Sequence, residues 1–69
     1  MKKNEANKLY IECKNVAINL TKTSVTRTIE SVKIILEDNH DITFLFYKGE
    51  IVKIEEFNGR ELIEKYVER

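Results

Sequence analysis

The sequence contains few or no residues of several types, and each absence excludes a structural feature or a class of protein. Its 69 residues contain one cysteine, two glycines, no proline and no tryptophan. A single cysteine excludes an intramolecular disulfide, so a domain of this size must rely on good packing or on a partner subunit. No apolar run approaches the roughly 18 residues of a membrane span. The lysines near the start are followed by no apolar stretch, so we expect no secretory signal and a cytoplasmic location.

Net charge is also lacking, because twelve basic residues balance twelve acidic ones. This balance argues against a general binder of nucleic acid or of anionic membranes. The distribution is nevertheless uneven: residues 1–33 carry a net charge of +4 and residues 34–69 a net charge of −4. Opposite charges on the two halves suit head-to-tail or two-fold self-association. A homodimer is therefore among the assemblies that we expect.

The composition carries information about origin. Residue types with AT-rich codons (Phe, Tyr, Met, Ile, Asn and Lys) outnumber those with GC-rich codons (Gly, Ala, Arg and Pro) by 31 to 7. This bias predicts an AT-rich genome, such as that of a low-GC bacterium, its phage or another mobile element.

The middle of the chain predicts an antiparallel meander of three strands. Residues 32–37, 42–47 and 51–57 alternate as strands do, and the segments 38–41 and 48–49 have the composition of turns. The strand at 42–47 is apolar on both faces, which is typical of a central strand covered on both sides.

The last eleven residues, 59–69, are expected to form a helix. Asn58 and Glu61 have the spacing of a capping box, although Asn58-Gly59 is also a strong hairpin signal. The residues that support the helix recur at helical spacing: Leu62, Ile63, Tyr66 and Val67.

The first thirty residues allow two interpretations. A helix over residues 4–20 places most apolar side chains on one face but leaves Ile11 and Ile18 on the opposite face. Two strands, over 9–13 and 16–20, instead place both isoleucines on faces with other apolar residues. The four asparagines between positions 4 and 19 also weaken the helix, because asparagine has a low helix propensity. We prefer strands, and residues 21–29, rich in Thr and Val, continue in the same way.

The predicted fold class is therefore α+β. We expect a single small domain over residues 1–69, with an antiparallel sheet of four or five strands in a meander and a C-terminal helix packed on one face.

Two groups of residues are candidates for binding another protein. Glu61, Glu64 and Glu68 would form an acidic surface along the C-terminal helix, or merely its solvated side. Leu45 and Tyr47 lie on the second face of the central strand, where with Ile35 they would form an apolar patch that another segment or a partner must cover.

Nucleic acid is the alternative partner. The acid-free stretch between Glu12 and Glu30 contains Lys14, Lys22 and Arg27 among several hydroxyl residues, a mixture used for phosphate contacts. Three charges give only a small salt-dependent attraction, and no aromatic residue for base stacking lies between Tyr10 and Phe44, so a solvated strand face explains the stretch equally. This alternative stays open at the level of sequence.

Nothing in the sequence indicates catalysis. His40, the only histidine, lies between Asp38 and Asp41 in a turn and lacks the separated ligands of a zinc site. We therefore expect no catalytic residues, metal or cofactor, and predict a small non-enzymatic regulatory or inhibitory protein that binds another protein.

Overall fold

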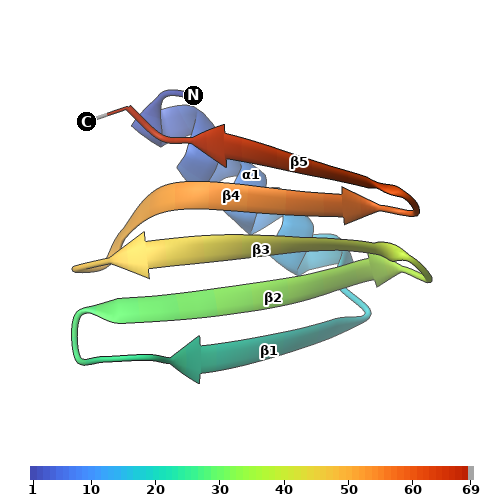
Figure 1. Ribbon diagram of the computed structural model, residues 1–69, viewed down its shortest axis with the longest axis horizontal. Coiled ribbons are helices and arrows are strands. Elements are labelled where there is room, and N and C mark those ends of the chain that lie inside the picture. Colours follow the sequence, from blue (N-terminus) through green and yellow to red (C-terminus); the bar gives the residue numbers. More distant parts are fainter. Residues whose placement is uncertain (69) are drawn as a thin grey trace.

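The computed structural model describes residues 1–68 and consists of one helix packed against one face of a five-stranded antiparallel sheet (Figure 1). The strands pair in the order in which they occur in the chain, β1-β2-β3-β4-β5. The elements are α1 (Lys3–Val16), β1 (Asn19–Ser24), β2 (Ile29–Glu37), β3 (His40–Tyr47), β4 (Glu50–Asn58) and β5 (Glu61–Tyr66). The prediction of an α+β fold with an antiparallel meander is thus confirmed, but the position of its helix is wrong.

The predicted C-terminal helix is a strand instead. Residues 61–66 form β5, which pairs antiparallel with β4 so that Asn58 lies opposite Glu61. The two-residue loop is Gly59-Arg60, and Gly59, at φ 66°, supplies the positive φ that a hairpin turn with glycine at its first central position needs. A helix over these residues would form hydrogen bonds only within itself and would leave the backbone N–H and C=O groups at the edge of β4 without partners. A fifth strand forms hydrogen bonds with that edge.

The N-terminal strands that we preferred are also wrong over residues 9–13. This segment belongs to α1, and only the region from Asn19 onward is extended. The low helix propensity of Asn4, Asn7 and Asn15 is outweighed by the packing of Ala6, Tyr10 and Cys13 against the sheet. Ile11 remains on the outer side, 59% exposed, as the helical alternative implied.

The helix is held to the sheet by a narrow apolar stripe. Ala6 and Cys13 are buried, and between them Tyr10 packs edge-on against Phe44 and Phe46, with ring centroids 5.0 and 5.1 Å apart. The spacing of these helical residues is the three-and-four repeat that keeps one face toward the sheet. The buried sheet residues beneath are Val32, Ile34, Ile42, Phe44, Ile51 and Ile54.

The helix covers one face only. The inward residues of β2, β3 and β4 alternate with residues that lie on the other face, and within residues 1–68 no element covers that second face. In Figure 1 the five strands run across the front of the molecule and α1 lies behind them. The two ends of the chain meet beside β5, where the Met1 ammonium donates to the Tyr66 carbonyl at 3.2 Å.

Truncation of Tyr10 tests the helix-to-sheet contact. We expect Tyr10→Ala to lower the free energy of unfolding by about 3 kcal/mol, because it removes the ring that joins the helix to two phenylalanines. The control is Ile11→Ala, an exposed site on the same helix, which should change stability by less than about 1 kcal/mol. Equal losses in urea denaturation would contradict this packing.

The turn between β3 and β4 allows a second test. Lys48 and Gly49 both have positive φ, at 51° and 80°, as a type I′ hairpin requires. Open space surrounds the position of a Gly49 Cβ, so Gly49→Ala should cost about 1–2 kcal/mol through backbone strain alone. Lys48→Asn in the same turn should leave stability unchanged or raise it, and a loss from both would refute the turn geometry; thermal unfolding measures both.

Candidate interaction surface

The uncovered face of the sheet, here called the open face, carries two apolar patches separated by a charged band. The first patch consists of Ile29, Leu45, Tyr47 and Val52 at one end of the sheet. These residues, with Phe46 and Lys48, line a shallow hollow of about 470 Å³. Tyr47 is 41% exposed and the other three are half-buried, so the patch is accessible to a partner.

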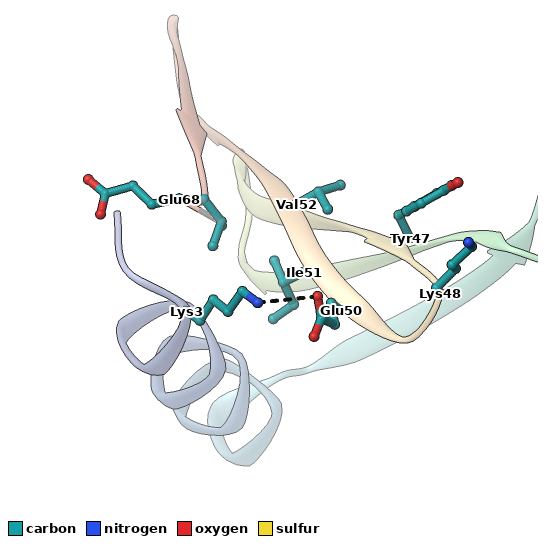
Figure 2. A pocket seen from close by; sticks show the side chains of 8 residues that line it. Lys3, Tyr47, Lys48, Glu50, Ile51, Val52 and Glu68 are labelled. Atoms are coloured by element: carbon teal, nitrogen blue, oxygen red, sulfur yellow. Dashed lines mark ion pairs between the residues drawn. The ribbon is translucent and has the colours of Figure 1, made fainter.

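A bulge in β4 builds this first patch. Leu45 pairs with Lys53, but the neighbouring Phe46 pairs with Ile51, so Val52 is an additional residue in β4. Figure 2 shows Val52 and Tyr47 on one side of the strands and Ile51 on the side of the helix. No sequence signal marks this bulge, and Val52 was therefore missed as a surface residue.

The second patch lies at the opposite end of the sheet. Ile35, Phe57 and Leu62 share one row of the register with Asp41, and Leu62 is 58% exposed. Ile35 is thus two rows away from Leu45, and the single patch that we expected from these residues is in fact split. A hairpin with Asn58-Gly59 as its two-residue loop would have placed Leu62 opposite Glu55, whereas the observed loop, Gly59-Arg60, places Leu62 opposite Phe57.

The charged band crosses the sheet between the patches. In one row, Lys33 of β2 lies beside Thr43 of β3, which in turn lies beside Glu55 of β4 and then Glu64 of β5. The positive charge of this row therefore lies on the β2 side of the sheet and the negative charges on the β4–β5 side.

Lys53 links the acidic end of the band to the neighbouring row. Its Nζ lies 3.4 Å from Glu55 and 3.6 Å from Glu64, and 5.3 Å from the centroid of the Tyr66 ring. Desolvation lowers the pKa of Lys53, but the hydrogen bond and charge of Glu55 and the charge of Glu64 outweigh it, so the pKa lies above its ordinary value. Lys53 therefore stays charged within this cluster.

The three glutamates predicted as one acidic surface do not share a face. Glu61 and Glu64 are separated by an odd number of positions in β5, so their side chains lie on opposite faces of the sheet. Glu68 follows β5, and its backbone N–H donates to the Met1 carbonyl at 2.7 Å. Only Glu64 lies on the open face, together with Leu45 and Tyr47.

The basic residues of the nucleic-acid alternative are dispersed as well. Lys14 lies on α1, with its Nζ 5.2 Å from the centroid of the Tyr10 ring. Lys22 lies on β1 and forms an ion pair with Glu30 at 3.0 Å, and Arg27 lies in the turn between β1 and β2. The three charges thus come from three different elements, and one of them is already paired.

Polar groups on the helical side of the sheet form local pairs. His40 Nε2 lies 2.8 Å from Glu56 Oε2, a half-buried contact between β3 and β4. Within residues 1–68, no group of three or more His, Cys, Asp or Glu side chains is placed to hold a metal ion. Desolvation, the charge of Glu56 and that of Glu12 all raise the pKa of the buried Cys13 thiol, which keeps it protonated.

A small cleft of about 250 Å³ lies where the start of α1 meets the start of β4 (Figure 2). Lys3 and Glu50 form an ion pair across it at 3.5 Å, and both side chains are more than half exposed. A solvent-exposed pair of this kind contributes little binding energy, so the cleft is a minor feature beside the open face.

Comparisons of the chain with protein-family models, with curated proteins and with solved structures found no match. No helix among the described residues is both long enough and apolar enough to cross a membrane. The surface chemistry described above is therefore the basis for inferring function.

The chemistry of Cys13 is open to a direct test. We expect its reaction with an aromatic disulfide reagent at pH 8 to be slower than that of a free thiol by about tenfold or more, because the thiol is buried and protonated. Unfolding in urea should restore the full rate. A rate in the folded protein equal to that of the free thiol would show that Cys13 is accessible.

Proposed function

We propose that this chain is a small non-enzymatic protein-binding domain that docks through the open face of its sheet. The observation that carries the proposal is the pair of apolar patches on a five-stranded sheet with a helix on one side only. Antiparallel sheets can expose one face, but that face is then usually polar. Here Leu45, Tyr47 and Phe57 take the place of polar residues.

The arrangement of charge supports a protein partner over nucleic acid. The open face contains both signs, with Lys33 and Lys53 against Glu55 and Glu64. A surface that follows a phosphate backbone needs a concentration of positive charge, whereas protein interfaces combine apolar cores with charges of both signs. A regulatory or inhibitory role fits such a domain, because binding alone is sufficient for it.

A matched pair of substitutions tests this docking surface. Tyr47 on the open face and Leu20 on the helical side of β1 are each 41% exposed, so Tyr47→Thr and Leu20→Thr remove comparable exposed groups while keeping a good strand former. We expect the tagged wild type and Leu20→Thr to retain a protein partner, either an untagged copy of the chain or another protein, from a lysate of an AT-rich bacterial host that also expresses the untagged chain. Tyr47→Thr combined with Leu45→Thr should lose it, because these changes remove the apolar centre of the first patch.

Half of each sample is treated with nuclease before capture. A partner retained in both halves supports protein docking, and circular dichroism verifies that the variants are folded. Loss of the partner from Leu20→Thr but not from the open-face variant would place the surface elsewhere. Recovery of nucleic acid, with every protein lost after nuclease, would favour the alternative that uses Lys14, Lys22 and Arg27.

A further inference from the structure

We infer that a second copy of this chain covers the open face, with the two sheets packed face to face about a two-fold axis parallel to β3. The inference rests on the proposed function and names the partner. It is drawn from the distribution of charged and apolar residues in the register of the sheet, which is complementary to itself about this one axis.

The charged band supplies the first argument. Lys33 and Glu55 lie on either side of β3, each one strand away from Thr43 in the same row. A half-turn about an axis along β3 exchanges the positions of β2 and β4, so Lys33 of one copy faces Glu55 of the other, twice in the dimer. Complementary charges of this kind fix the register of an interface and disfavour other arrangements.

The apolar patches follow the same symmetry. Ile35 of β2 and Phe57 of β4 share a row and lie on either side of Asp41, so each faces the other across the axis. Leu45 lies on β3 itself and faces its own symmetry mate. Tyr47 also lies on β3 and faces its own symmetry mate. The centres of both patches therefore meet apolar surface, whereas Leu62 at the edge faces Asn19.

The other in-plane axis, perpendicular to the strands, gives the opposite result. If this axis passes through the row of Thr43, Lys33 of one copy lies against Lys33 of the second copy, and Glu55 lies against Glu55. It would also bring Asp41 onto Leu45, since these residues lie on β3 at equal distances from Thr43. Like charges at an interface are costly, and the axis along β3 sets only Asp41 against a like charge, so the axis along β3 is favoured over this one.

The charges on the open face itself agree with the chosen axis. Lys33 lies on the β2 side of β3, and Glu55 and Glu64 lie on the β4–β5 side. Rotation about β3 places the β1–β2 side of each copy over the β4–β5 side of the other.

The size of the face allows such a dimer. The molecule measures 30 × 23 × 22 Å, and its shortest dimension is the one along which Figure 1 views the sheet. These extents limit the projected area of the open face to about 700 Å² per copy, so a dimer must bury most of the face to approach the roughly 800 Å² per partner of a standard interface. Aligned sheets pack within about 30° of each other, so the rows stay in register near the axis.

One like-charge contact remains in this arrangement. Asp41 lies on β3, so the two Asp41 carboxylates approach each other at one end of the interface. The two carboxylates lie between the Ile35–Phe57 contacts in the end row of the sheet, so their repulsion weakens the dimer. Asp41→Asn should therefore strengthen the dimer.

A charge exchange between two variants tests the contact across the axis. Light scattering after gel filtration should give the wild type the mass of a dimer. Lys33→Glu alone and Glu55→Lys alone should each weaken the dimer by about tenfold or more, because each sets like charges against one another. Mixed in equal amounts, the two variants should form a heterodimer by native mass spectrometry, since both contacts then join opposite charges.

A cross-link provides a second measurement that does not depend on the charges. In a Cys13→Ala background, Leu45→Cys places a thiol on the axis and should give a covalent dimer with a short bis-maleimide, because packed sheets lie about 10 Å apart, a gap too wide for a direct disulfide. Thr21→Cys, on β1 in the row of Lys33, lies far from its own symmetry mate and should remain uncross-linked. Cross-linking of Thr21→Cys but not of Leu45→Cys would overturn the proposed axis.

The outcomes separate this inference from the proposed function. A wild type that stays monomeric at millimolar concentration, or a mixture of the charge variants that fails to pair, overturns the inference. If the wild type is monomeric but captures a different protein that the double variant Tyr47→Thr and Leu45→Thr does not capture, the open face remains a docking surface for that other partner. A monomer whose captured proteins are unaffected by these substitutions overturns both.

Discussion

The contact of Tyr10 with Phe44 and Phe46 is the interaction on which the rest of the structure depends. It fixes which face of the helix meets the sheet and therefore which face of the sheet is enclosed. Because α1 is the only helix among residues 1–68, enclosing one face necessarily leaves the other face bare. The open face is thus a direct consequence of which side of the sheet Tyr10 packs against.

The strand meander was predictable because its signals are local. Residues 32–57 are rich in β-branched and aromatic residues and are interrupted by turn residues at Asn39 and Gly49, both of which adopt positive φ. The ends of the chain were not predictable in this way. Residues 61–66 satisfy both helical and strand spacing, and the open edge of β4 decides between the two, a contact that no local pattern contains.

The candidate surface was likewise predictable only for the residues that belong to the central strands. Leu45 and Tyr47 were identified as needing a cover because β3 alternates on two apolar faces. Leu62 and Glu64 were assigned to a helix, so their alignment with Phe57 and Glu55 could not be anticipated. Val52 depends on a bulge, which is set by packing across three strands.

The order of the strands has a consequence for how the chain folds. Each strand pairs with its neighbour in sequence, across connections of two to four residues. Closing such short loops costs little conformational entropy, whereas most β-rich proteins must first bring distant segments together. The hairpins can therefore form independently of one another, and the docking of α1 is the step that joins remote parts of the chain. This topology gives a sheet protein the folding kinetics of a more local architecture.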